Sequence, residues 1–137
     1  MDRNHWMDVF SSAIWQQQFE DFLASGGNVK ETSHGEESGL IHYAIDAENY
    51  AAVNWLVANG ADINAADAMG WTALHYAVDS DIDVAVQANL PVEFRAARFM
   101  ISAGIDESIK DKSGFTARDV AAEYGATVLE QYDLLMN

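Results

Sequence analysis

Two histidines are the residues whose spacing first suggests a metal site. His42 and His75 lie 33 positions apart, and each is preceded by an aliphatic residue and followed by Tyr-Ala. This match places both in the same slot of successive helical units, whose helices pack about 8–10 Å apart. Two ligands of one zinc ion each lie only about 2 Å from it. The spacing therefore suits a shared ion poorly, and we predict a structural role for both side chains.

An aspartate-rich segment offers a second candidate. Asp79, Asp81 and Asp83 follow the alternating pattern that begins an EF-hand calcium loop. The glycine and the bidentate glutamate that complete such a loop would fall at Val84 and Leu90, and both are absent. We therefore predict an exposed acidic loop without a metal ion.

The residue types and motifs of the chain disfavour catalysis. The chain has no cysteine, and its sequence has no nucleophile motif, no phosphate-binding glycine loop and no HExxH pair. Pairs of acids arise by number alone among 22 carboxylates, without an assembled constellation. We predict that the protein is not an enzyme and needs no cofactor.

The elements that position these residues repeat along the chain. In the segment 67–77, Gly70 suits a tight turn, Thr72 is a good N-cap, and Leu74 and Ala77 share one helical face. The Asp, Gly, aromatic, Thr and Ala letters of this segment return 44 positions later, from Asp111. A recurring turn and helix indicate a repeat protein.

Four units follow, with boundaries at about 1–33, 34–66, 67–110 and 111–137 of a single domain. The first keeps only apolar residues at helical spacing and a terminating Gly26-Gly27. The second predicts helices at about 40–47 and 51–59. The third has eleven extra residues, which we place between its helices around 79–91, with Pro91 beginning a second helix over 92–103. Gly125 separates the helices of the fourth.

Composition and charge narrow the class further. The chain has 137 residues, half of them hydrophobic, with no signal-like start and no apolar run of about 18 residues, so we expect a cytoplasmic protein. Its net charge is −15, and the interval between Lys30 and Arg95 holds eleven acids and no Lys or Arg. Such a field repels nucleic acid and anionic membranes and attracts basic proteins, or it serves solubility alone.

The letters of the repeats resemble the ankyrin-repeat family. The resemblance rests on Gly70-x-Thr72-Ala73-Leu74-His75-x-Ala77 and on Leu56-Val57-x-x-Gly60-Ala61-Asp62-Ile63-Asn64. It implies an all-α solenoid of about four helix-turn-helix repeats, here with an 11-residue insertion in the third. It also implies that the histidines hydrogen-bond to a neighbouring turn. The sequence departs from the usual ankyrin pattern in three places, which are the insertion, Gly39 where Thr is usual and Arg118 where Leu is usual.

A core follows from this alignment. Trp55 and Phe99 occupy equivalent slots and are expected to fill the space between second helices. The expected core residues are Leu40, Ile41, Ala44, Val53, Leu56, Leu74, Ala77, Phe99, Ile101, Ala117, Val120 and Ala121.

The resemblance also implies a recognition face. Trp71 and Phe115 fall in the slot at the base of the finger on the concave face, with Met69 at the adjacent turn tip. Exposed aromatic residues are frequent in binding hot spots; the alternative is that the two rings pack on each other or on the insertion. The predicted partner-binding residues are Glu36, Ser38, Asp46, Met69, Trp71, Asp79, Ser80, Asp81, Asp83, Phe115, Glu123 and Tyr124.

These features favour a protein-binding module that is a monomer on its own. A short, acidic ankyrin protein resembles bacterial immunity proteins or antitoxins, which inhibit a basic toxic enzyme such as a nuclease. The alternative is a general scaffold or adaptor, including a host-directed effector. The first hypothesis predicts one tight partner and the second predicts several weaker ones.

Overall fold

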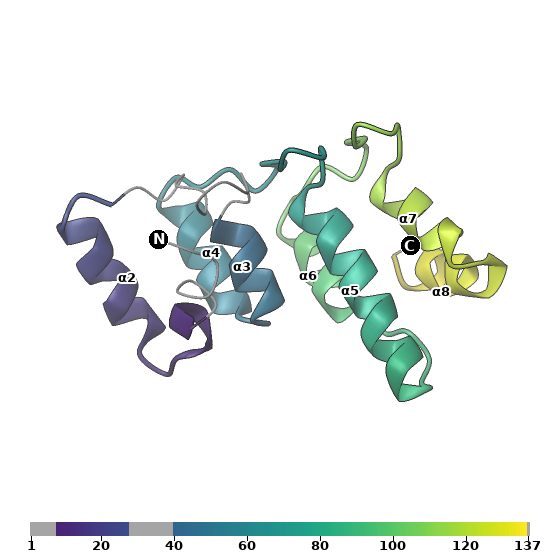
Figure 1. The fold of residues 1–137 in the computed structure, drawn as a ribbon, viewed down its shortest axis with the longest axis horizontal. Helices are drawn as coiled ribbons and strands as arrows, with labels where there is room; N and C mark the ends of the chain where they lie inside the picture. The colour runs from purple at the N-terminus through teal and green to yellow at the C-terminus, as the bar shows by residue number, and fades with distance from the viewer. Residues whose placement is uncertain (1–7, 28–39, 137) are drawn as a thin grey trace. The chain divides into compact units, whose positions relative to one another are not determined.

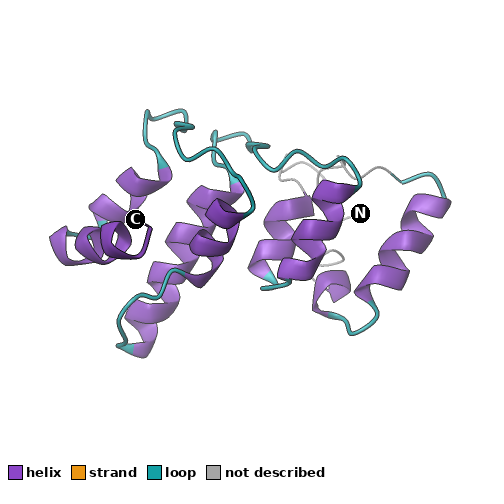
Figure 2. Ribbon diagram, turned by 180° about the vertical axis from the view of Figure 1, so that it is seen from behind, coloured by secondary structure: helices purple, strands orange, loops and turns teal. Residues whose placement is uncertain are grey.

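The computed structural model describes residues 8–27 and 40–136, and every regular element in these two ranges is an α-helix (Figures 1 and 2). The chain forms two compact units, residues 1–68 and residues 69–137. The first contains α2 (Trp15–Ala24), α3 (Leu40–Asp46) and α4 (Tyr50–Ala58), and the second contains α5 (Ala73–Ala88), α6 (Arg95–Ser102), α7 (Ala117–Glu123) and α8 (Ala126–Met136). The prediction of an all-helical repeat fold is confirmed. None of the described helices has the length and apolarity that crossing a bilayer requires.

The first unit is held by aromatic side chains. The Trp55 ring of α4 meets the Trp15 and Phe19 rings of α2 edge-on, at centroid distances of 6.2 and 5.1 Å. Phe19 is fully buried and also stacks on Phe10, at 5.9 Å. Trp55 thus fills the space between α4 and α2, which is the second helix of the preceding repeat, as its slot predicts. Helices α3 and α4 begin and end within one residue of the predicted bounds.

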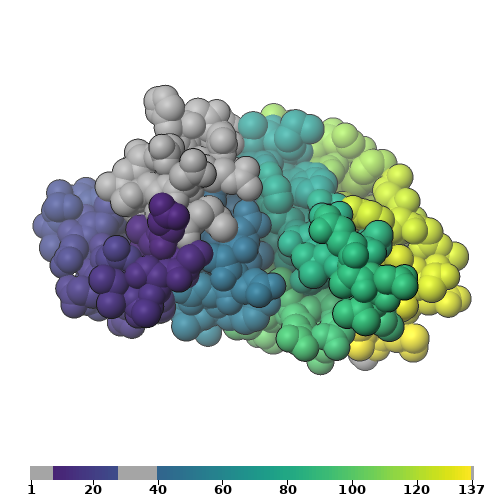
Figure 3. All heavy atoms as spheres, turned by 60° about the horizontal axis from the view of Figure 1, so that its bottom comes forward, coloured from purple at the N-terminus to yellow at the C-terminus, as the bar shows by residue number. Residues whose placement is uncertain are grey.

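The third unit differs from its prediction, because the inserted residues are helical. Helix α5 has 16 residues and continues to Ala88, so that most of the predicted 79–91 loop is helix. The continuation buries Val78, Ile82 and Ala85, which keep the three-to-four spacing of an apolar stripe. Asn89, in the left-handed conformation at φ 55°, ends the helix. The lengthened end of α5, coloured green, lies toward the viewer in Figure 3.

Helix α6 also begins later than predicted. It starts at Arg95, and Pro91 lies in the non-helical segment before it, so that Pro91 does not begin the helix. Phe94, just before α6, has a left-handed backbone with φ 52°, which a helix does not contain. Its buried ring contacts the Tyr132 ring edge-on, at a centroid distance of 5.3 Å. Burial of this ring fixes the segment in a conformation that a helix does not contain.

Most of the predicted core is buried. Two members, Phe99 and Ile101, are only half-buried, and for them the prediction is wrong. The buried side of α6 is made by Ala96, Ala97 and Met100. Phe99 and Ile101 lie about 100° to either side of Met100 around the helix and so border the buried stripe. The other ten expected residues are buried, namely Leu40, Ile41, Ala44, Val53, Leu56, Leu74, Ala77, Ala117, Val120 and Ala121.

Asp81 is expected to stabilise the fold. Its Oδ2 accepts a hydrogen bond of 3.1 Å from the Ala97 amide in the first turn of α6, where the N-cap residue Phe94 has no side-chain acceptor. We expect Asp81→Ala to lower the free energy of unfolding by about 1 kcal/mol, because it removes a helix cap. Asp83→Ala is the matched control, because Asp83 is exposed and, among the described residues, accepts a hydrogen bond from Gln87 of the same helix alone. Urea unfolding compares them, and equal losses would exclude this role for Asp81.

Candidate binding face

The turn before α5 is fixed by a histidine. Thr72 is the N-cap of α5, as predicted, and its amide donates to Nδ1 of His75 at 3.1 Å. Because Nδ1 accepts this bond, the ring proton lies on Nε2, which donates to the Phe115 carbonyl oxygen at 2.9 Å. Both residues are almost fully buried, at 1% exposure each. The predicted hydrogen bond from His75 to a neighbouring turn is confirmed.

Trp71 is anchored to the next turn. Its Nε1 donates to Oδ2 of Asp111 at 2.9 Å. The indole ring is half-buried, stacks on the His75 ring at 5.7 Å and meets the Tyr76 ring edge-on at 5.0 Å. Trp71 therefore packs against the first turn of α5, which follows it in the chain. Part of its surface remains exposed.

Asp111 is not among the predicted site residues, although it begins the recurring turn. Its Oδ1 accepts from the amides of Ser113 and Phe115, at 2.8 and 2.9 Å, in addition to the bond from Trp71. The Phe115 amide, followed by the other donors, lowers the pKa of this carboxyl below its usual value. The signal that could have identified it is its place at the start of the recurring turn, where an Asp side chain folds back onto the amides two residues on and beyond.

The corresponding cap in the last repeat uses a carboxylate. Asp119 stands in the slot of His75, and its Oδ2 accepts from the Thr116 amide at 2.9 Å. Thr116 in turn accepts from the Asp119 amide at 3.3 Å, which completes a capping box. The Thr116 amide lowers the pKa of Asp119. Asp119 thus caps only the start of its own helix, whereas His75 also bonds to the following turn.

A second bridge joins α5 to the end of α7. The Tyr124 hydroxyl donates to Oδ1 of Asp79 at 2.6 Å. Together with the Trp71–Asp111 bond, it fastens α7 and its turn to α5 at both ends. We call the exposed and half-exposed residues associated with these two bridges the α5–α7 face; they are Met69, Trp71, Asp79, Ser80, Asp83, Phe115, Glu123 and Tyr124.

The Tyr124 bridge predicts a pH effect. The hydrogen bond to Asp79 and then burial raise the phenol pKa from 10.0 to about 12. A raised folded-state pKa stabilises the fold fully below the unfolded value, and this contribution falls between pH 10 and 12. We expect Tyr124→Phe to weaken the loss of stability across this window and to remove one late-titrating group from the phenolate absorbance curve. Tyr132 also titrates at about 12 and keeps its late titration in this variant. An unchanged absorbance curve would contradict the assignment.

Some of the predicted site residues lie outside the α5–α7 face. Glu36 and Ser38 lie outside the described residues, and Asp46 is exposed at the end of α3 in the first unit. Asp81 faces α6. Met69, Phe115 and Tyr124 are exposed by 64%, 40% and 43% respectively, and Ser80, Asp83 and Glu123 are exposed.

Among residues 8–27 and 40–136, no three His, Cys, Asp or Glu side chains are grouped so as to hold a metal ion. His42 is buried, at 4% exposure.

In the second unit, the turn before α5 is hydrogen-bonded to the turn before α7, and each turn is followed by a pair of helices. This arrangement is that of a helical-repeat protein. A family profile described as "Ankyrin repeats (many copies)" matches residues 41–81. A curated relative, the RelA-associated inhibitor of Mus musculus, is 38% identical over 73 residues, which cover 52% of this chain and 9% of the relative. The crystal structure of the ankyrin repeat domain of Bcl-3, described as a unique member of the IkappaB protein family, superposes with a TM-score of 0.64 and 19% identity, over 90% of this chain and 48% of that one.

Residues 41–81 match the ankyrin-repeat family, and the chain has an ankyrin-repeat fold. The likeness to Bcl-3 concerns the fold. The chain spans less than a tenth of the length of the curated relative that it matches.

Proposed function

We propose that this protein is a non-catalytic binding module that engages a basic protein through the α5–α7 face. The observation that carries the proposal is the composition of this face. Its apolar side chains Met69, Phe115 and Tyr124 are exposed, as are the carboxylates of Asp83 and Glu123, and Asp83 lies close enough to Tyr124 for its charge to act on the phenol. Apolar anchors with a charged rim are the usual anatomy of a protein interface.

Electrostatics favour a basic partner. The interval between Lys30 and Arg95 contains no positive side chain, and it includes all of α5. A surface of one sign accelerates the association of an oppositely charged protein. The same field opposes direct binding to nucleic acid or to anionic membranes.

The specific partner that we propose is a basic toxic enzyme, such as a nuclease, which this chain inhibits as an immunity protein or antitoxin in a bacterial cytoplasm. A nuclease binds phosphates in a basic cleft, and the acidic face would occupy that cleft. The curated relative is named as an inhibitor associated with another protein, which is compatible with inhibition by binding. The protein would act as a monomer without a cofactor.

A scaffold or adaptor, including a host-directed effector, is the second candidate. The division of the chain into two compact units favours it, because each unit has a surface of its own. A scaffold would bind several partners through separate patches. An inhibitor would have one tight partner whose association rate falls steeply with salt.

The test is association with the basic protein encoded beside this chain, measured at several salt concentrations. We expect the pair Asp83→Lys and Glu123→Lys to slow association about tenfold or more and to reduce its salt dependence. Asp79 and Asp81 are left unchanged because they hold the fold. Glu130→Lys, at an exposed position of α8, is the control of equal chemistry. A neighbouring reading frame that encodes no toxin, with no basic protein co-purifying, would remove the immunity hypothesis.

A further inference from the structure

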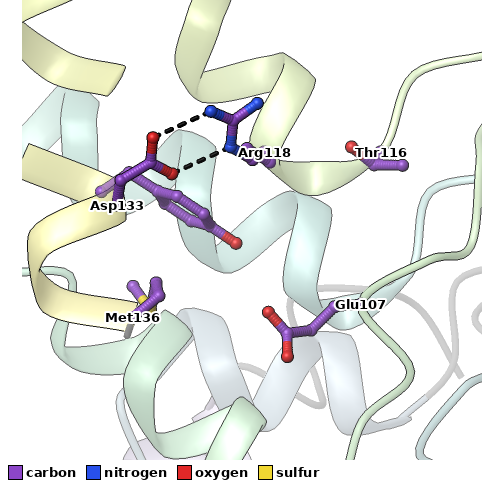
Figure 4. A pocket seen from close by; sticks show the side chains of 6 residues that line it. Glu107, Thr116, Arg118, Asp133 and Met136 are labelled. Carbon is purple, nitrogen blue, oxygen red and sulfur yellow. Dashed lines mark hydrogen bonds and ion pairs between the residues drawn. The ribbon is translucent and has the colours of Figure 1, made fainter. Parts of the chain in front are cut away.

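The second unit contains a cavity apart from the α5–α7 bridges. It has a volume of about 410 Å³ and is lined by Glu107, Thr116, Arg118, Tyr132, Asp133 and Met136 (Figure 4). It opens to solvent past Arg118 and Asp133, whose side chains are exposed by 53% and 39%. A volume of this order is that of a small-molecule site or of a pocket for one side chain.

The positive charge in the wall is already neutralised. Arg118 Nε donates to Asp133 Oδ1 at 2.9 Å, and its Nη2 donates to Oδ2 at 2.8 Å. Such a bidentate pair is geometrically specific and satisfies the carboxylate. An anion entering the cavity would therefore meet no unpaired cation among the residues that line it, and it would face the charge of Glu107.

Two polar groups in the wall are left for a ligand. Tyr132 is 3% exposed, and in residues 8–27 and 40–136 its hydroxyl makes no hydrogen bond. A buried polar group of this kind costs free energy until it finds a partner. Glu107 lies across the cavity from the Arg118–Asp133 pair, and no described residue forms an ion pair with it.

The two groups act on each other through the cavity. Burial first, and then the charge of Glu107, raise the pKa of Tyr132 to about 12, so its hydroxyl is neutral at ordinary pH. A neutral phenol oxygen accepts a hydrogen bond, and the Glu107 carboxylate accepts others. Both groups thus suit a ligand that carries several N–H donors and a positive charge, while Met136 offers a surface to an alkyl stem.

We propose that this cavity binds an alkylammonium or guanidinium group, held by the Glu107 carboxylate and the Tyr132 hydroxyl. The group is the head of a lysine or arginine side chain or of a free amine. The inference goes beyond the proposed function and does not depend on the α5–α7 face, since its test needs no protein partner.

The test uses n-butylammonium as the probe, followed by chemical shifts of the backbone amides of the purified full chain. We expect saturable shifts confined to residues 107, 116–118 and 132–136, and no comparable shifts with neutral n-butanol at equal ionic strength. Glu107→Gln should weaken binding about tenfold or more, because it removes a charge-assisted hydrogen bond. Glu130→Gln, on the same unit but outside the cavity, should leave binding unchanged.

Tyr132→Phe provides a second variant, which keeps the ring against Phe94 and removes only the hydroxyl. It should weaken binding at least about threefold, in keeping with the loss of one hydrogen bond. If it unfolds, Glu107→Gln still decides, because Glu107 is exposed. Equal shifts with butanol, or equal effects of the Glu107 and Glu130 variants, would overturn the proposal. Tighter binding of the peptide Gly-Lys-Gly than of butylammonium would assign the site to a protein side chain, and the reverse order would assign it to a free amine.

Discussion

Gly70→Ala is expected to lower the free energy of unfolding by about 3 kcal/mol, the sum of a strained backbone and a steric clash. Gly70 has φ +81°, and an added Cβ would lie 2.8 Å from the Lys112 amide nitrogen and 3.0 Å from the Asp111 Cα. Both neighbours are backbone of the next turn, which is also bonded here through the Lys112 amide and the Met69 carbonyl oxygen at 3.0 Å. The turns would have to separate, and the bond between them would be lost.

Gly114 provides the matched control for this variant. It occupies the same slot of the following turn at φ +87°, but a Cβ there would meet nothing within 4 Å. Gly114→Ala should therefore cost only the backbone strain, about 1 kcal/mol. Denaturant unfolding of both variants isolates the close approach of the turns. Equal losses would mean that the approach contributes nothing beyond conformation.

His75→Ala should destabilise the second unit by a comparable amount, about 3 kcal/mol. The change leaves the buried Thr72 amide without an acceptor, removes the bond to Phe115 and opens a cavity under Trp71, which stacks on the ring. Equilibrium unfolding followed by tryptophan fluorescence and by circular dichroism measures the loss.

Two further variants separate the functions of His75. His75→Asp retains an acceptor for Thr72, as Asp119 does for Thr116, but it cannot donate to the Phe115 carbonyl oxygen. It also buries a charge, so it should not recover the stability of the original protein. Asp119→Ala should cost less than His75→Ala, because Asp119 is half-exposed and water replaces part of its bond. A larger loss from Asp119→Ala would contradict the importance that we assign to the second nitrogen of His75.

The same two residues show what could be predicted. Gly70 and His75 were identified from the recurring turn, and the structural role of His75 follows from its slot. Local capping and helical spacing decide such features, so short stretches of sequence contain them. The reason that Gly70 tolerates no side chain is different, because the backbone of residues 111–112 approaches it only in the folded chain.

The errors lie where local signals competed with packing. Pro91 and the acids of 79–83 indicated a loop and a new helix, but burial of Val78, Ile82 and Ala85 extends α5 through that segment. Burial of Phe94 against Tyr132 then delays α6. A proline is compatible with a helix start and does not require one.

The candidate site divides in the same way. The types of its residues and the charge of their surroundings could be predicted, because both are properties of the sequence. The tertiary structure separated Asp81, which caps α6, from Asp83, which is exposed, and it tied Trp71 to Asp111 and Tyr124 to Asp79.

The sequence by itself determined the repeat period, the helix pairs, the capping residues and the acidic character of this protein. The tertiary structure alone decided which polar groups are paired and which are left for a ligand, as in the cavity of Glu107 and Tyr132. The physical reason is that hydrogen bonding and burial depend on distances between residues far apart in the chain, which periodicity does not specify.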